Sequence, residues 1–243
     1  MTEQLDLAGT LELSAPVSEL LPQTPLPSTD DVRSLVLHTS GLPRIPKGMI
    51  TTVAEARDPY VKFTTAYFDA EVSPALAEQH RGTVGSFEYS NLGYAVLTRL
   101  LEVVTGRDWW SLASDEVFTP LGITGVSIHP APERVPVLRT WTGGVRQQWT
   151  DTGPFIGAGG ICGTFEALEQ YGTAIAAQSR GVRPFGWMDD PTLWWHNGHN
   201  RDHGAFIGVS HDGVRSVTAH TLGYNAGRAD QIAATLERHY PQA

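Results

Sequence analysis

The sequence has 243 residues, 41% of them hydrophobic and seven of them Trp, which is enough apolar material to bury a globular core. Its formal net charge is -9, from 26 acidic and 17 basic side chains without a basic cluster, so nucleic acid is excluded as an expected partner. The single cysteine, Cys162, excludes an internal disulfide and a zinc cage built from several thiolates.

The N-terminal third predicts short helices joined by loops. A proline-rich connector leads to a short helix, which Asp30 or Asp31 caps and Gly41 closes. Residues 41–58 are expected to form a loop. Aromatic side chains at helical spacing then predict a second helix over 60–79.

The most regular apolar pattern begins at Asn91 and predicts a helix with one buried face. Gly106 lies just past its end, where a glycine often closes a helix. Asp108 is expected to cap the next helix, which Pro120 and Gly122 stop. The apolar positions of the first pattern are Leu92, Val96, Leu97, Leu100, Leu101 and Val104.

The second half of the chain predicts loops, then a helix, then strands. Residues 123–160 are rich in Gly, Pro, Thr and Trp, so short strands and loops are expected there. Thr164 opens a helix that runs to about Gln178. Asp212-Gly213 predicts a tight hairpin between the last two strands. The strands are expected over 193–196, 205–209 and 214–222.

The order of these elements indicates the fold class. A last helix is expected after the strands, with Ile232, Ala233, Leu236 and Tyr240 on one side. Helices come first and an antiparallel sheet comes near the end, without the alternation of strand and helix that a parallel sheet needs. The predicted fold class is therefore α+β.

Several common site motifs are absent. The sequence has no phosphate-binding P-loop and no H-E-x-x-H zinc helix. GVSHDG at 208–213 is not a nucleophile elbow, because Asp212 stands in place of its second glycine. His196, His199 and His203 are close in sequence, but on a strand and its loop they would not share a face. We therefore expect no metal and no cofactor, and a histidine metal hydrolase stays only an alternative.

The segment EYSN at 88–91 stands directly before the apolar helix. Taken alone, it reads as a helix start, with Tyr89 in the core and Ser90 or Asn91 as the cap. The same three side chains also fit the acid/base corner of an active site, because a phenol beside cations can accept a proton and then return it to a leaving group. A free tyrosine, with a pKa of ~10, would be a poor base at neutral pH.

Five segments in a fixed order connect this corner to a known family. They are GTLELSAPVSELLP with LVLHTSGLP, EYSN with the helix after it, VFTPLGITG, GAGGICGTFEALEQYG, and WWHNGHNRDHGAFIGV. In this order, over nearly the whole chain, the sequence resembles the serine β-lactamase and penicillin-recognising family in its class C branch, which also includes D-Ala-D-Ala peptidases and esterases. The resemblance implies one β-lactamase/transpeptidase-like domain over 1–243, with a helical part at about 30–180 and the sheet and last helix at about 190–240.

In that family the serine of S-x-x-K attacks a carbonyl and forms an acyl-enzyme. The lysine of that motif and the tyrosine of Y-x-N manage the proton. The resemblance assigns the tyrosine role to Tyr89. It assigns to Asn91 the role of holding the substrate amide and the lysine.

The third family motif, K-T-G, reads His196-Asn197-Gly198 in this chain. Gly198 suits a strand that a substrate backbone approaches, and the backbone N–H of His199 would form half of an oxyanion hole. A histidine, with a pKa of ~6.5, weakens recognition of a carboxylate by a fixed cation, which argues against a β-lactamase. The alternative for His196 is a half-buried strand histidine without a catalytic role.

The nucleophile motif is missing from the sequence. The two lysines are preceded, three residues earlier, by Arg44 and Pro59, so S-x-x-K does not occur. In the family this motif opens a helix that runs into a G-x-L-x-L-x-x-P-V stretch, which residues 9–17 match. We therefore expect the N-terminal helix and strands of the fold to lie before Met1. The chain alone should then be inactive, because nothing is left for the tyrosine to assist.

The functional expectation is a β-lactamase-related serine hydrolase acting on the carbonyl of an ester, amide or peptide. The alternative is a pseudoenzyme or binding module that keeps the cleft. Missing strands would leave an unpaired apolar edge at 214–222, so self-association or a partner at that edge is expected. Trp141 and Trp149 are candidates to line an aromatic cleft, and Cys162 is expected to be a small buried residue rather than a substitute nucleophile.

Localisation stays open. No run approaches the roughly eighteen apolar residues that span a bilayer, and the first residues carry neither the basic start nor the apolar core of an export signal. As printed, the chain reads as cytoplasmic. An export signal would sit in the same upstream segment as the missing motif.

Overall fold

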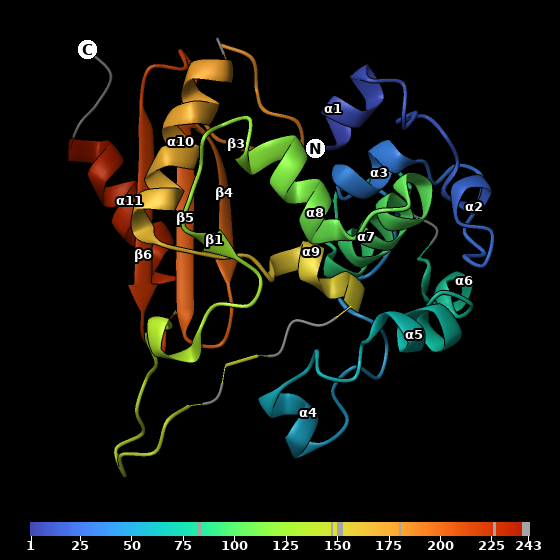
Figure 1. The fold of residues 1–243 in the computed structure, drawn as a ribbon, viewed down its shortest axis with the longest axis horizontal. Helices are drawn as coiled ribbons and strands as arrows, with labels where there is room; N and C mark the ends of the chain where they lie inside the picture. Colours follow the sequence, from blue (N-terminus) through green and yellow to red (C-terminus); the bar gives the residue numbers. More distant parts are fainter. Residues whose placement is uncertain (82–83, 147, 150–152, 180, 226, 240–243) are drawn as a thin grey trace. The chain divides into compact units, whose positions relative to one another are not determined.

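The computed structural model describes residues 1–81, 84–146, 148–149, 153–179, 181–225 and 227–239 (Figure 1). The chain divides into two compact units, which are described in turn. The first comprises Met1–Pro120 and Trp149–Gly160, and the second comprises Leu121–Gln148 and Ile161–Ala243. The expectation of a single domain stays a prediction.

The first unit is helical. Its α-helices are α1 (Thr2–Leu7), α2 (Val17–Leu20), α3 (Val32–Val36), α4 (Val53–Arg57), α5 (Thr65–Tyr67), α6 (Leu76–Gln79), α7 (Asn91–Thr105), α8 (Trp109–Ala113) and α9 (Ile156–Gly159). Wider or tighter turns occur at η1 (Phe68–Val72), η2 (Ser114–Phe118) and η4 (Gly153–Phe155).

Helix α7 lies at the centre of this unit and confirms the most regular prediction. Ser90 caps its first turn, and Gly106 ends it with a φ of 66° that favours glycine. α3, α8, α9 and η4 pack against it. Its buried face consists of Leu92, Gly93, Ala95, Val96, Leu97, Thr98, Leu100 and Leu101.

An aromatic cluster fills the other part of the core of this unit. The rings of Phe63 and Phe155 meet edge to face with centroids 5.1 Å apart, and Phe68 lies 6.2 Å from Phe155. All three side chains are fully buried. Burying three such rings stabilises the unit by several kcal/mol, since each contributes roughly 1.5–3 kcal/mol.

The caps predicted at Asp31 and Asp108 are confirmed, because each carboxylate accepts the N–H of the third residue that follows it. Three details of the prediction are wrong. Helix α3 ends at Val36, well before Gly41. The expected loop at 41–58 contains α4, and the expected helix at 60–79 is broken into α5, η1 and α6.

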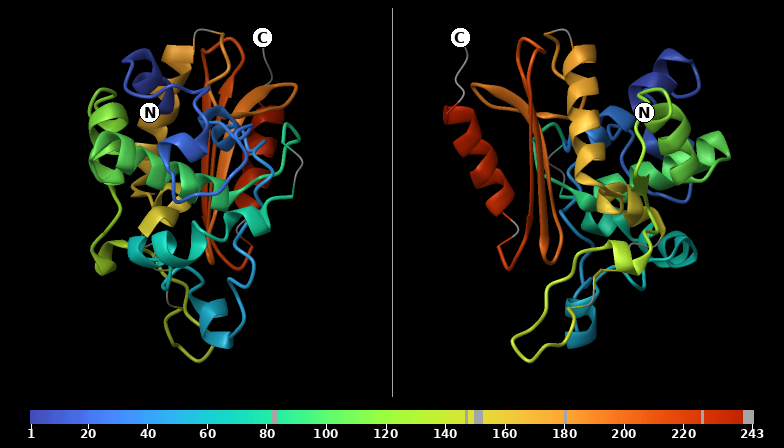
Figure 2. Two further views of the ribbon diagram at one scale, coloured as in Figure 1. Left: turned by 90° about the vertical axis from the view of Figure 1, so that its right-hand side faces the viewer. Right: turned by 60° about the vertical axis from the view of Figure 1, so that its left-hand side comes forward.

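The second unit contains the sheet and its two flanking helices. Its elements are β1 (Val126–Ser127), η3 (Pro132–Arg134), β2 (Cys162–Gly163), α10 (Phe165–Ser179), β3 (Met188–Asp189), β4 (Leu193–His199), β5 (His203–Ser210), β6 (Ser216–Leu222) and α11 (Arg228–His239). The main sheet is antiparallel with the order β3-β4-β5-β6. Helices α10 and α11 cover its two opposite faces (Figure 2).

The three predicted strands are present: the structure extends the first two and starts the third at Ser216 instead of Val214. β4 continues past His196 to His199, and the turn after β5 is closed by Ser210, whose hydroxyl donates to Asp212. Between the sheet and α11 the core contains Leu193, Phe206, Ala219, Ala229 and Ala233. In α11 the predicted Ala233 is buried, Ile232 and Leu236 are partly exposed, and Tyr240 lies outside the described residues.

A hairpin in the loop before β2 is tied to the sheet of the second unit. Arg146 forms an ion pair of 3.1 Å with Asp202, a fully buried carboxylate, and its guanidinium lies 4.9 Å from the ring centroid of Tyr224. The carbonyl of Pro136 lies 3.0 Å from His203 Nε2. At the tip of the hairpin Trp141 is 97% exposed, so in this unit it lines no cleft.

Two further findings concern the surface. Cys162 is exposed, so the prediction of a buried cysteine is wrong. Cys162 pairs with Ser127 in a two-stranded ribbon of only two residues per strand, and both residues of β2 are exposed. None of the described helices is both long and apolar enough to cross a membrane.

Candidate active site

Tyr89 and Asn91 lie in the first unit, on either side of the residue that caps α7. Ser90 is 1% exposed, and its Oγ donates to the carbonyl of Pro43 at 2.7 Å and accepts the N–H of Gly93 at 2.8 Å. Both functions of this hydroxyl are therefore occupied. Ser90 is the helix cap, and the segment is fixed at the first turn of a long helix.

His38 holds the backbone of the segment 88–90 through hydrogen bonds. It is 3% exposed and has a φ of 57°, a left-handed conformation that is uncommon outside glycine. Its Nδ1 accepts the backbone N–H of Ser90 at 3.1 Å, and its carbonyl accepts the N–H of Glu88 at 2.8 Å. The two bonds hold the backbone on both sides of Tyr89. Because Nδ1 accepts, the ring proton of the neutral imidazole is on Nε2.

The phenol ring of Tyr89 contacts this histidine and lies near a cation. Its ring centroid lies 4.5 Å from that of His38, and the guanidinium carbon of Arg44 lies 5.9 Å from it. Burial raises the pKa of Tyr89, and the positive charge of Arg44 lowers it by a smaller amount. Tyr89 is therefore a protonated phenol at neutral pH.

Asn91 is the first residue of α7 and is half-buried. Its backbone N–H donates to the carbonyl of Arg44 at 2.9 Å. Its side-chain amide donates to the hydroxyl of Tyr60 at 3.4 Å, and Tyr60 packs edge-on against Trp149 with ring centroids 5.6 Å apart. The amide of Asn91 is thus oriented by an aromatic pair of the same unit.

His196 lies in the second unit on β4, opposite Ile207 of β5. Its Nδ1 is 2.9 Å from the carbonyl of Asn197, which can only accept, so Nδ1 donates. Burial lowers the pKa of His196, while the bond to Asn197 raises it by a smaller amount. The imidazole is therefore neutral at pH 7 and presents the lone pair of Nε2.

The backbone N–H of His199 lies on an open edge of the sheet. In an antiparallel ladder, successive residues point their N–H groups to opposite sides. The N–H of Asn200 donates to His203 across the β4–β5 turn, so that of His199 points away from β5. On that side β3 pairs only with Trp194 and Trp195, and no other described strand covers β4.

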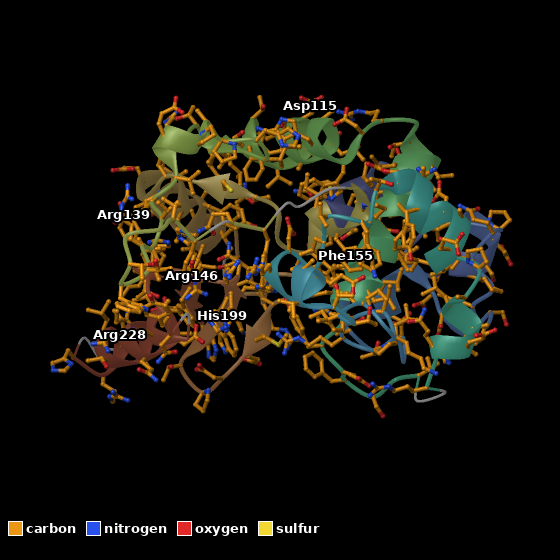
Figure 3. All side chains as sticks on the ribbon, turned by 90° about the horizontal axis from the view of Figure 1, so that it is seen from below. Asp115, Arg139, Arg146, Phe155, His199 and Arg228 are labelled. Carbon is orange, nitrogen blue, oxygen red and sulfur yellow. The ribbon has the colours of Figure 1, made fainter. Side chains whose placement is uncertain are left out.

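A carboxylate on α11 fixes the side chains at this end of β4. Asp230 Oδ2 accepts from the side-chain amide of Asn197 at 3.1 Å and lies 3.2 Å from Nε2 of His199, which is labelled in Figure 3. At Gly198 an added Cβ would meet no heavy atom within 4 Å, so packing does not demand glycine there. The space beside Gly198 is open to a ligand backbone.

The structure thus brings the sequence-predicted residues together in two groups. Tyr89 and Asn91 flank one cap in the first unit, and His196, Gly198 and His199 form one strand end in the second. Within the described ranges, no three His, Cys, Asp or Glu side chains are arranged to hold a metal ion.

Sequence reasoning missed three residues that these groups depend on. They are His38, Arg44 and Asp230. The motif LVLHTSGLP contains His38, but its sequence gives no sign that the imidazole contacts a residue about fifty positions later. No local sequence pattern indicates a role for Arg44 or Asp230.

Known proteins resemble this chain in sequence and in fold. A family model described as Beta-lactamase matches residues 1–237. Penicillin-binding protein 4 of Amycolatopsis lactamdurans is 32% identical over 127 residues, which cover 49% of this chain and 30% of that protein. The matched stretch is therefore less than a third of the relative's length.

Solved structures show the same fold. The octameric penicillin-binding protein homologue from Pyrococcus abyssi has a TM-score of 0.77 at 17% identity, covering 97% of this chain and 61% of that one. The β-lactamase/D-alanine carboxypeptidase from Yersinia pestis has a TM-score of 0.71 at 17% identity, covering 97% of this chain and 78% of that one. Together with the antiparallel sheet, these likenesses confirm the predicted α+β, β-lactamase/transpeptidase-like fold class.

Proposed function

This chain belongs to the β-lactamase family, whose model spans residues 1–237, and on that premise we propose that it carries the proton-transfer and oxyanion groups of a serine hydrolase. The reaction is acyl-enzyme hydrolysis of an ester, amide or peptide bond. Tyr89 and Asn91 act on the proton and on the substrate amide. The strand end at His196, Gly198 and His199 receives the substrate backbone and the oxyanion.

The observation that carries this proposal is the open N–H of His199. An oxyanion hole needs a backbone donor that is not already used and that a substrate oxygen can reach. The register of β4 supports such a donor at the residue directly after the H-N-G motif, because the N–H of His199 points away from β5, β3 has ended there and Gly198 leaves room. The register of β4 and β5, in addition to the H-N-G motif, favours the role of the His199 N–H as an oxyanion donor.

The protonation of Tyr89 supports a second part of the proposal, that these 243 residues do not turn over substrate by themselves. A buried phenol whose pKa is raised can donate a proton to a leaving group, but it is a poor base. Activating a serine requires a nearby base, and the printed sequence contains no S-x-x-K to supply the serine and the lysine. The cap Ser90 is not a substitute, because its hydroxyl is fully engaged.

The test is a combined search for turnover and for a covalent adduct. The 243-residue polypeptide is incubated with nitrocefin and with p-nitrophenyl acetate, and intact mass is measured after exposure to benzylpenicillin. We expect both substrates to be hydrolysed no faster than in buffer without protein. The mass of the protein should not increase after exposure to benzylpenicillin. Turnover or an acyl adduct that disappears in Tyr89→Phe would show that a nucleophile exists within the chain and would overturn the second part of the proposal.

A second candidate function, binding without catalysis, is favoured by the edge of the sheet. β6 pairs with β5 on one side, and no described strand covers its other side. Unpaired edges accept an added strand from another chain. Light scattering at several concentrations tests this. Self-association that Thr218→Pro suppresses supports pairing through β6, and a monomer at all concentrations argues against self-pairing.

A further inference from the structure

The hairpin of residues 136–146 is anchored to the main sheet through a histidine of β5. The carbonyl of Pro136 lies 3.0 Å from His203 Nε2, and a carbonyl can only accept, so Nε2 donates. The other nitrogen of this ring, Nδ1, lies 3.1 Å from Nε2 of His220 on β6. The register of β5 and β6 makes the two imidazoles diagonal neighbours on one face of the sheet.

The geometry of the pair determines how many protons it can hold. In the neutral pair, His203 has its proton on Nε2 and accepts through Nδ1, so His220 donates from its Nε2. One added proton keeps both hydrogen bonds, because it can enter Nδ1 of His220, away from both contacts. A second added proton makes Nδ1 of His203 a donor as well. Two N–H groups then face each other at 3.1 Å, and two positive charges lie side by side.

The surroundings of the pair disfavour the second charge. Partial loss of water around His220 lowers its pKa, and a charge on His203 lowers it further. Helix α10 packs on the same face of the sheet, and its buried residues are uncharged. Asp230 of α11 binds side chains on the opposite face. The charged side chains of the adjoining segments are four arginines and one aspartate: Arg139 and Arg146 in the hairpin, Arg201 and Asp202 before β5, and Arg228 after β6. Acid therefore adds charge to a region that already has an excess of cations.

The hairpin is a unit that is attached at its two ends. Inside it, the N–H of Thr140 donates to Gly144 at 2.8 Å and the N–H of Arg146 donates to Leu138 at 3.0 Å. Among the described residues, its hydrogen bonds and ion pairs with the rest of the second unit are made by Pro136 and Arg146. Loss of the contact at Pro136 therefore leaves the hairpin attached mainly at one end.

Both attachment points lie directly after the strand end of the candidate site. Arg146 binds Asp202, and the contact of the other end is to His203. Asn200 closes the turn between these residues and His199, because its N–H donates to the carbonyl of His203 and its side-chain oxygen accepts the N–H groups of Asp202 and His203. The docked hairpin thus holds the turn that follows the candidate oxyanion donor.

We propose that residues 136–146 form a strap that is docked on the sheet while the His203–His220 pair carries no more than one added proton and is released when both imidazoles are charged. The proposal goes beyond the hydrolase function and does not depend on it. In the hydrolase, release of the strap loosens the turn after His199, so acid weakens the oxyanion site.

The direction of the pH dependence follows from His220. Its pKa in the docked state is lower than the ordinary value of 6.5, which it regains when the strap is released. Docking is therefore at full strength above about pH 6.5 and weakens progressively as the pH falls below that value.

The experiment measures backbone NMR order parameters of Thr140 and Arg146 at about pH 7.5 and about pH 4.5. In the wild type we expect about 0.85 at the higher pH and less than about 0.6 at the lower pH, the values of rigid and flexible backbone. The amide of Gly213 in the β5–β6 turn should stay unchanged, which shows that the sheet remains folded. His220→Gln should keep the strap rigid at both pH values, because its amide can donate to or accept from His203 and does not titrate.

Two further variants separate the pair from other effects of acid. His203→Ala removes the contact with Pro136, so its strap should be mobile even at the higher pH. His239→Gln changes an exposed histidine of α11 and should respond to pH as the wild type does.

A wild-type strap that stays rigid at the lower pH would overturn the proposal. Equal loosening of His220→Gln and the wild type would do the same, because it would assign the acid response to the Arg146–Asp202 ion pair. A rigid strap in His203→Ala at the higher pH would show that the pair does not hold it. Turnover plays no part in these measurements, so the strap and the hydrolase function can fail separately.

Discussion

The imidazole of His38 lies against the phenol of Tyr89, with ring centroids 4.5 Å apart, although the two residues are separated by about fifty positions in the sequence. The other face of the imidazole stacks on Tyr94, at 4.7 Å and an interplanar angle of 18°. Tyr94 lies in the first turn of α7. One buried histidine therefore couples the candidate acid to the helix that carries the rest of its motif.

Removing this histidine should destabilise the first unit. His38→Ala deletes two ring contacts and leaves the N–H of Ser90 without its acceptor, which together should lower the free energy of unfolding by about 3 kcal/mol. His38→Asn should lose less, because asparagine tolerates a positive φ and its amide oxygen can accept. Urea denaturation measures both variants. A loss below about 1 kcal/mol in His38→Ala would contradict this role.

The buried phenols predict a loss of stability at alkaline pH. Burial raises the folded-state pKa of Tyr89 and Tyr171 above the ordinary value of 10.0. As the pH passes this value, the unfolded state releases the phenolic protons first and the folded state still holds them. The free energy of unfolding therefore falls as the pH rises above about 10 and is unaffected by these groups at lower pH.

Phenylalanine variants check the assignment of this slope. Tyr89→Phe and Tyr171→Phe should each flatten the decline of stability between about pH 9 and about pH 11, because neither ring can then ionise. The measurement is urea denaturation at a series of pH values. An unchanged slope in the double variant would show that other groups cause the decline.

Asp230 should act as a positioning residue for the end of β4. Asp230→Asn weakens the contacts to Asn197 and His199 and should lower the free energy of unfolding by about 1 kcal/mol. The side-chain amide NMR signal of Asn197 should also move. Gln231→Ala, an exposed neighbour on the same helix turn, is the matched control and should stay within about 0.5 kcal/mol of the wild type. If both variants leave that signal unmoved, Asp230 does not hold the strand end.

The sequence predicted those helix ends that a nearby side chain or a glycine determines. Asp31, Ser90 and Asp108 each cap a helix through their own side chains, and Gly106 ends one through its backbone freedom. Helix α4 was predictable on the same grounds, because Thr52 and Glu55 form a capping box whose spacing is visible in the sequence. The prediction of a loop there overlooked it.

Tertiary contacts explain what the sequence did not reveal. The stop predicted at Gly41 failed because His38 takes the left-handed conformation, stabilised by stacking on Tyr89 and Tyr94. The helix expected over 60–79 widens at Phe68 in the aromatic core and leaves helical geometry only after Ser73. Such changes in helix geometry depend on contacts with residues far away in the sequence, which a helical pattern of apolar residues does not reveal. The same holds for the site, where Arg44 became visible only through its contact with Tyr89.

The roles of the two site groups can be measured by titrating acetyl-D-alanyl-D-alanine into the 243-residue chain and recording its amide NMR spectrum. We predict that the backbone amide proton of His199 shifts as it gains an acceptor and that the side-chain amide of Asn91 shifts with the same affinity, while the amide of Gly213 in the β5–β6 turn does not. Tyr89→Phe should bind with similar affinity, because the phenol acts on the proton. If His199 and Asn91 stay unmoved at saturating ligand, or respond with unrelated affinities, the account of this chain as the carrier of one hydrolase's proton-transfer and oxyanion groups is wrong.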